Sequence, residues 1–218
     1  MSSEISVLKE SGSGRAWLLL IDDSRYQQFA QRLYDQLTAG CRALLILLPR
    51  IDSRNWREVS DELRETAARK GLRQISLIAF GDAAASAQDL ALRQAKLVRS
   101  LVLVDAHTRP HPSRCSRLLA AIERSLPLGL PFRRRDGGFD GKPFLQRLRC
   151  PVLIATTGSD AYAQGEARAL HEGAPISWRL ECGSPQELAA ALRSFQEIPV
   201  KRPQKNLRPP GGADALPL

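Results

Sequence analysis

Short apolar runs alternate with longer amphipathic segments along most of this chain, from Arg15 to about residue 197. The apolar runs are rich in leucine and β-branched side chains and have no polar face, which is typical of strands buried on both sides of a sheet. The alternation predicts right-handed β-α-β units and therefore an α/β fold, with a mostly parallel central sheet and helices on both faces. We expect strands over residues 16–21, 43–48, 74–80, 100–105, 152–156 and 177–181.

The segments between these runs carry apolar residues at helical spacing. They predict helices over residues 26–38, 56–70, 82–95, 113–125, 166–172 and 185–196. Several helix ends have recognisable signals, with two capping-box spacings at helix starts and two glycines where helices should stop. These signals are Ser24 with Gln27, Ser184 with Glu187, Gly40 and Gly71.

The composition fits a single globular domain, over residues 1–199. The chain has 218 residues, 43% of them hydrophobic and 25% charged, so folding can bury a stable core without disulfides or a structural metal. The four cysteines (Cys41, Cys115, Cys150 and Cys182) form no CxxC pair, which argues against a zinc site and is typical of a reducing compartment. The first ten residues are polar, and no apolar run approaches the roughly 20 residues of a membrane span. We therefore expect a cytoplasmic protein without a transmembrane segment.

The net charge of +9 is concentrated in two segments. Residues 109–150 hold ten basic and three acidic side chains, and residues 200–218 hold four and one. The second segment is rich in proline and glycine and is expected to be a disordered basic tail. Such segments attract acidic proteins or anionic surfaces, although a solvated basic surface explains the same charge. The expected partner-binding residues are Arg133, Arg134 and Arg135 in the first segment, and Lys201, Arg202 and Lys205 in the second.

Two classes of ligand are disfavoured. Nucleic acid is disfavoured because the tail has no aromatic residue to stack on bases, and no helix-turn-helix or zinc-finger signature occurs. A dinucleotide would need a glycine-rich turn after the first strand, but that turn reads Asp22-Asp23-Ser24-Arg25, and its carboxylates would repel a pyrophosphate. The Gly12-Ser13-Gly14 triplet precedes the strand, and no P-loop motif is present. We expect no cofactor and no bound metal.

The centre of the chain resembles the α/β-hydrolase family. Residues 75–93 read ISLIAFGDAAASAQDLALR and residues 98–105 read VRSLVLVD. The family has a strand, a G-x-S-x-G turn, an alanine-rich helix and a V-x-x-L-V-L-x-D strand in this order. Residues 150–160, CPVLIATTGSD, are similar to the strand and turn that present the family's acidic residue. The resemblance spans about residues 15–197.

The resemblance implies a trimmed version of the family's fold. Only one of the family's N-terminal antiparallel strands has room, near residues 5–9. A small helical lid is implied over about residues 107–150, with the predicted helix 113–125 inside it.

Laid on the family's pattern, the catalytic positions lack their usual residues. Gly81 takes the place of the nucleophilic serine, in a strained turn that glycine adopts with little penalty. The loop that holds the family's histidine reads Cys-Gly-Ser at residues 182–184. Asp160 matches the acidic residue by position, but a carboxylate with no imidazole to orient cannot activate a nucleophile. Asp82 and the pair Asp22-Asp23 stand at the oxyanion-hole positions, where their charge would oppose an oxyanion.

These features favour a non-catalytic α/β-hydrolase-like protein that acts as a binding, scaffold or regulatory module through its lid and basic surface. Gly81, Asp82 and Asp160 would then mark a degenerate site. One alternative is a hydrolase or acyltransferase acting on small acyl esters through a relocated nucleophile, for which Asp82, Ser86 and Cys182 are the candidates. Another is a weak nucleic-acid binder that uses the basic tail. We expect structural or exposed roles for the three histidines, His107, His111 and His171.

Overall fold

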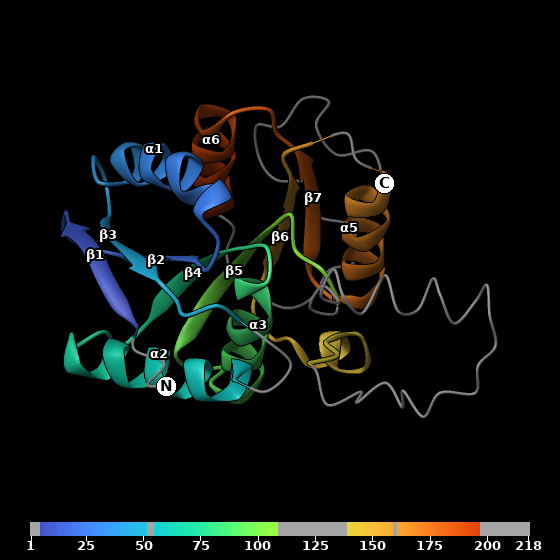
Figure 1. Cartoon of the computed structure of the whole chain (residues 1–218), viewed down its shortest axis with the longest axis horizontal. Coiled ribbons are helices and arrows are strands. Elements are labelled where there is room, and N and C mark those ends of the chain that lie inside the picture. Colours follow the sequence, from blue (N-terminus) through green and yellow to red (C-terminus); the bar gives the residue numbers. More distant parts are fainter. Residues whose placement is uncertain (1–4, 52–54, 109–138, 159–160, 197–218) are drawn as a thin grey trace, which may run out of the picture.

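The computed structural model describes residues 5–51, 55–108, 139–158 and 161–196. Within these residues, seven strands form one sheet in the order β1-β3-β2-β4-β5-β6-β7, which runs from left to right in Figure 1. The strands are β1 (Ser6–Ser11), β2 (Ala16–Ile21), β3 (Arg42–Leu47), β4 (Ile75–Phe80), β5 (Val98–Val104), β6 (Val152–Thr156) and β7 (Ser177–Glu181). Every neighbouring pair is parallel except β1 with β3. The predicted α/β class and the single N-terminal antiparallel strand are confirmed.

Helices cover both faces of the sheet, as Figure 1 shows. The helices are α1 (Gln27–Leu37), α2 (Trp56–Arg69), α3 (Ala83–Arg93), α5 (Ala161–Gly173) and α6 (Pro185–Gln196), with 3-10 helices η1 (Ser24–Tyr26) and η2 (Lys142–Arg147). The side chains of α1 and α6 share one core with one face of the sheet. Those of α2, α3 and α5 share the second core with the opposite face. The result is a three-layer arrangement of helix, sheet and helix.

The central strands carry no polar face because both of their faces are covered. Every residue of β2 and β4 is buried. In β2, Trp17 and Leu19 belong to the core under α1 and α6, whereas Leu18 and Leu20 belong to the core over α2 and α3. Each fully buried leucine stabilises the fold by about 1.5–3 kcal/mol. Because these strands are parallel, the loops that follow them meet at one edge of the sheet, where a site can be built.

One charged network fixes α3 against α2. The guanidinium of Arg93, near the end of α3, donates to Asp89 Oδ2 at 2.7 Å, to Asp61 Oδ1 at 2.8 Å and to Ser60 Oγ at 2.9 Å. Asp61 and Ser60 belong to α2. The network therefore holds in place the helix that follows the central strand β4.

Two predicted helix starts differ from the structure. Ser24 does not cap α1, because residues 24–26 form the 3-10 helix η1 and Asp23 Oδ1 accepts the N–H of Arg25 at 2.9 Å instead. The helix expected from residue 166 begins at Ala161. Gly165 interrupts its apolar spacing and mimics a helix breaker, yet a single glycine costs only about 1 kcal/mol inside a helix.

Two of the other expected helix ends have the predicted geometry, whereas the stop expected at Gly40 does not. Helix α1 ends at Leu37 with Thr38 as its C-cap, and Gly40 does not have a positive φ. Ser184 Oγ accepts the N–H of Glu187 at 3.3 Å, and Glu187 Oε2 accepts the N–H of Gly183 at 2.8 Å. Gly71 has a φ of +67° and ends α2. The predicted helix 113–125 lies outside the described residues.

Candidate functional site

β4 leads into α3 through a sharp turn at Gly81. The φ of Gly81 is +57°, in the left-handed region, and its N–H donates to the carbonyl of Val104 at 2.9 Å. Asp82 follows at the N-cap position of α3. Residues 83–91 of the helix are all buried, because small alanine side chains let it lie close against the sheet. The predicted strand, turn and helix with Gly81 at the turn are confirmed.

The space next to the Gly81 Cα is occupied by the side chain of Tyr26. A Cβ atom at Gly81 would lie 2.8 Å from Cε2 of Tyr26 and 3.4 Å from Nη2 of Arg25. The ring of the buried Tyr26 packs on Phe80, with 5.5 Å between the two ring centroids. The guanidinium carbon of Arg25 lies 4.5 Å from the centroid of the Tyr26 ring. These contacts hold the tyrosine in place, so any side chain at position 81 requires Tyr26 to move.

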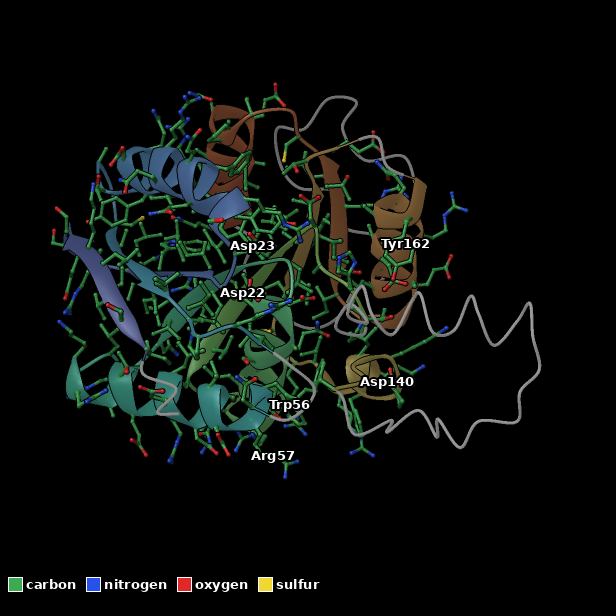
Figure 2. The ribbon with its side chains drawn as sticks, in the orientation of Figure 1. Asp22, Asp23, Trp56, Arg57, Asp140 and Tyr162 are labelled. Atoms are coloured by element: carbon green, nitrogen blue, oxygen red, sulfur yellow. The ribbon has the colours of Figure 1, made fainter. Side chains whose placement is uncertain are left out.

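Carboxylates gather around this turn from the ends of neighbouring strands. Asp22 follows β2, Asp82 follows β4 and Asp105 follows β5; Figure 2 shows Asp22 and Asp23 at the end of the sheet between the two helical layers. Oδ1 of Asp22 is buried and has no hydrogen-bond partner among the described residues. Burial, and next the charge of Asp82, raise the pKa of Asp22 to about 7. Asp22 is therefore partly protonated near neutral pH.

Asp105 ties the ends of β5 and β6 together. Its φ is +47°, a conformation that aspartate tolerates better than most side chains. Its carboxylate accepts the backbone N–H of Thr157 at 2.8 Å and also the Thr157 hydroxyl. Burial, followed by the charge of Asp105, raises the pKa of Tyr26, so the phenol beside Gly81 stays protonated. The edge of the sheet thus combines acidic groups with a neutral tyrosine.

The raised pKa of Asp22 predicts a loss of stability as pH rises. The unfolded chain releases this proton near the ordinary aspartate pKa of 3.8, whereas the folded protein holds it to about pH 7. Between these values the folded state binds more protons, so rising pH lowers the free energy of unfolding. Asp22→Asn removes this contribution. As pH rises from about 5 to about 8, the free energy of unfolding of the variant should increase by about 2 kcal/mol relative to that of wild type. Urea denaturation at each pH measures the difference.

Asp35→Asn, at an exposed carboxylate on α1, is the matched control. Its difference from wild type should stay constant over the same pH range. If the difference in the free energy of unfolding between Asp22→Asn and wild type were also constant with pH, Asp22 would be ionised over the whole range. The conclusion that burial and neighbouring carboxylates raise its pKa would then be wrong.

Comparisons with known proteins decide what this architecture is. No protein-family model matches the chain, and a search of curated proteins finds no match. A thermophilic esterase from Thermogutta terrifontis is similar in structure, with a TM-score of 0.68 and 17% identity over 89% of this chain and 93% of the esterase. An α/β hydrolase from a sediment metagenome of the Mar Chica lagoon gives 0.63 and 14%, over 89% and 95% of the two chains. The chain has the α/β-hydrolase fold.

The enol-lactonase from Burkholderia xenovorans extends the same similarity, with a TM-score of 0.65 and 11% identity over 90% of this chain and 97% of the lactonase. Identities this low establish the fold alone. These similarities cover 89–90% of this chain and 93–97% of each neighbour, so they extend over most of both chains.

Residues 182–184, which match the loop that carries the histidine in the α/β-hydrolase family, form a helix cap in this chain. Residues 182–184 join β7 directly to α6, and the N–H of Gly183 is bound by the carboxylate of Glu187. His107, after β5, is buried with its ring centroid 5.5 Å from that of Tyr162. His171 Nδ1 lies 2.9 Å from the hydroxyl of Ser177, at the start of β7. The start of a strand is the opposite edge of the sheet from Gly81, so His171 is not part of this site.

Two of the candidate relocated nucleophiles, Ser86 and Cys182, are poorly suited to attack. Ser86 is fully buried, and its hydroxyl donates to the carbonyl of Trp56 at 2.8 Å. Burial, then the charges of Asp105 and Glu187, raise the pKa of the buried Cys182 thiol to about 12. A thiol with such a pKa is protonated at neutral pH and therefore a weak nucleophile.

Several predicted site residues lie outside the described residues. These are Asp160, the lid segment 109–138 with Arg133, Arg134 and Arg135, and the tail with Lys201, Arg202 and Lys205. In the part of the chain that the structure describes, no three His, Cys, Asp or Glu residues come together as a metal site. No helix there is long and apolar enough to cross a membrane.

Sequence reasoning missed the role of Tyr26. The sequence signal was present only in part, since Ser24-Arg25-Tyr26 follows the two aspartates in the loop after β2. Nothing in that local pattern reveals that the ring reaches across to β4 and covers Gly81. The contact joins residues 55 positions apart and depends on β2 lying next to β4 in the sheet.

Proposed function

We propose that this chain is a non-catalytic member of the α/β-hydrolase fold that acts by binding a partner. The observation that carries the proposal is the occupied turn at Gly81: the position has no side chain, and the ring of Tyr26 fills the space where one would project. An attacking group at this turn would need both a side chain and an open approach. Neither is available while Tyr26 packs on Phe80.

The surroundings of the turn support the same proposal. Asp22 and Asp82 repel each other strongly enough to contribute to the raised pKa of Asp22, so further negative charge is unfavourable there. An oxyanion intermediate would add such charge at this place. The helix cap at residues 182–184 contains no imidazole to act as a general base.

The rival is the activity that the similar esterase and lactonase carry in their names, ester or lactone hydrolysis. Incubation with a fluorophosphonate probe and with p-nitrophenyl acetate distinguishes the two functions. We expect no covalent labelling and no hydrolysis above that of the heat-unfolded protein. Labelling of Ser86, or of any serine, together with turnover, would overturn the non-catalytic proposal.

We propose further that the partner is an acidic protein, met by the basic residues of segments 109–150 and 200–218. The support is the charge distribution, since the rest of the chain has nearly balanced charge. Exposed basic side chains mainly accelerate encounter, and salt screens them beyond about 8 Å at physiological ionic strength.

A charge-reduced variant tests the binding surface. Replacing Arg133, Arg134 and Arg135 by serine should weaken binding of a fluorescent polyglutamate peptide about tenfold at about 50 mM salt and very little at about 300 mM salt. Fluorescence anisotropy measures the affinity, and the thermal unfolding midpoint should not change.

The matched control removes the same charge elsewhere, with Arg32, Arg64 and Arg193 changed to serine on the exposed sides of α1, α2 and α6. Equal weakening in both triple variants would mean that only net charge matters. That result would show that the basic segments act only as a solvated charged surface, and it would overturn their assignment as the partner-binding surface.

A further inference from the structure

A polar groove lies beside the site, between α5 and the ends of β6 and β7. Its volume is about 720 Å³. Its walls come from three elements: Thr156 at the end of β6, Gln164 and Arg168 on α5, and Arg179 on β7. Figure 1 shows α5 standing next to β7 at the edge of the sheet. A groove of this volume accommodates a small metabolite.

Positive charge from two elements faces this groove. Arg168 is exposed on α5, and no carboxylate of the described residues forms an ion pair with it. The side chain of Arg179 is only 24% exposed. Within the described residues its ion pair is a long one, 3.6 Å to Glu181, whose own side chain is 64% exposed. Two guanidinium groups with weak or no internal partners are suited to hold an oxyanion in fork geometry.

The effect of Arg179 is also visible on its neighbour. Burial, and next the charge of Arg179, lower the pKa of His171, which lies one turn beyond Arg168 on α5. The lowered pKa leaves His171 largely neutral at physiological pH. Arg168 and Arg179 are the two cationic side chains among the described residues that line the groove.

The remaining walls supply space, neutral hydrogen-bonding groups and one carboxylate, that of Glu181, which lies 3.6 Å from the Arg179 guanidinium and is mostly exposed to solvent. A Cβ atom added to Gly158 or Gly165 would meet nothing within 4 Å, so both glycines border open space. The Gln164 amide is held at 3.3 Å from Thr156 Oγ1 and 3.5 Å from the carbonyl of Gly158, the latter at the limit of a hydrogen bond. Such a weakly held amide can be recruited by a ligand hydroxyl or oxyanion.

We propose that this groove binds a small organic anion, whose phosphate or carboxylate group is held between Arg168 and Arg179 and whose polar remainder lies along Gln164 and the glycine-lined floor. The described residues that line the groove belong to β6, α5, β7 and the residues that follow the two strands, outside segments 109–150 and 200–218. It gives the chain a small-molecule ligand in addition to any macromolecular partner.

Nuclear magnetic resonance titration of the full chain tests this site directly. Glycerol 3-phosphate, citrate and neutral glycerol are added to ¹⁵N-labelled protein, and the amide signals of Gly158, Gly165 and Gly183 are followed. We expect at least one of the two anions to shift these signals with a dissociation constant below about 1 mM, while glycerol produces no saturable shift. Tighter binding of glycerol 3-phosphate assigns the phosphate group, and tighter binding of citrate assigns the carboxylate.

Three variants locate the ligand. Arg168→Gln should weaken binding at least about tenfold by removing a charge-assisted contact. Gly165→Leu should do the same by filling the groove while keeping both arginines, and it should not lower the thermal midpoint because leucine is the better helix former. Arg193→Gln, at an exposed arginine on α6, is the control and should bind within about twofold of wild type.

The proposal is overturned if neither anion gives saturable shifts at the three glycines up to about 10 mM. It is equally overturned if Arg168→Gln binds as wild type does, or if Arg193→Gln weakens binding as much as Arg168→Gln. These readouts do not involve ester hydrolysis or polyglutamate binding, so they can fail while the proposed function stands.

Discussion

Replacing Gly12 by alanine should destabilise the protein by about 4 kcal/mol or more, a large part of the roughly 5–15 kcal/mol by which a domain is usually stable. Gly12 lies in the turn between β1 and β2 with a φ of +84°. A Cβ atom there would overlap the backbone carbonyl oxygen of Cys41 and lie 2.9 Å from its carbonyl carbon. Cys41 directly precedes β3, the neighbour of β2, so relieving the overlap displaces the connection into the centre of the sheet. Urea denaturation, or the yield of folded protein, measures the loss.

Gly14→Ala provides a closely matched control for this substitution. Gly14 lies in the same turn with a φ of +89°, but a Cβ atom there would meet nothing within 4 Å. The control therefore carries the backbone strain alone, about 1–2 kcal/mol. If both variants lost the same stability, the overlap with the Cys41 carbonyl would contribute nothing, and the explanation given for Gly12→Ala would be wrong.

The second large effect is expected for Gly81→Ser, which places a hydroxyl at the turn before α3. The variant should lose about 3 kcal/mol of stability, from the strain of a φ of +57° and from overlap with Tyr26, and should gain no esterase activity. A hydroxyl at this position has no imidazole in residues 182–184 to deprotonate it. Urea denaturation and p-nitrophenyl acetate hydrolysis are the two measurements.

Two further variants separate the causes of this loss. Gly71→Ser has a similar φ of +67° with open space around its Cβ, so it should lose only the strain, about 1–2 kcal/mol. Adding Gly81→Ser to a Tyr26→Ala background should cost less stability than adding it to wild type, because the overlapping ring is gone. Hydrolysis by Gly81→Ser in either background would show that a general base and an oxyanion site are present, and would contradict the argument that this edge of the sheet holds only a degenerate site.

The chain order of the elements follows from local patterns in the sequence. The fully apolar runs, such as Ala16–Ile21, predict central strands because any polar side chain there would be buried without a partner. The turn at Gly81 was equally readable, since the small residues around it match a strand-turn-helix pattern over nineteen positions. The low identity to similar structures does not weaken this result, because the hydrophobic pattern and the turn chemistry tolerate many substitutions.

Helix starts were less readable where two local signals competed. Ser24 and Asp23 are both good capping residues, and the sequence does not say which one caps the first turn. The structure selects Asp23, because η1 occupies residues 24–26 before α1 begins. Gly165 has a poor helix propensity, so the sequence predicted a later start for α5. In the structure, the packing of α5 on β6 and β7 outweighs this propensity, and the helix begins at Ala161.

The chemistry of the site was decided by the tertiary structure, because it depends on residues brought together across the sheet. The sequence by itself determined that Gly81 carries no side chain, that residues 182–184 hold no histidine and that aspartates follow the strands. Only the adjacency of β2 and β4 places Tyr26 over Gly81 and Asp82 near Asp22. Burial there, and next the charge of Asp82, raise the pKa of Asp22. Arg168 and Arg179 likewise meet at one groove because α5 packs beside β7. Hydrophobic periodicity is a local property of the chain, whereas desolvation and close approach arise only when distant segments share one surface.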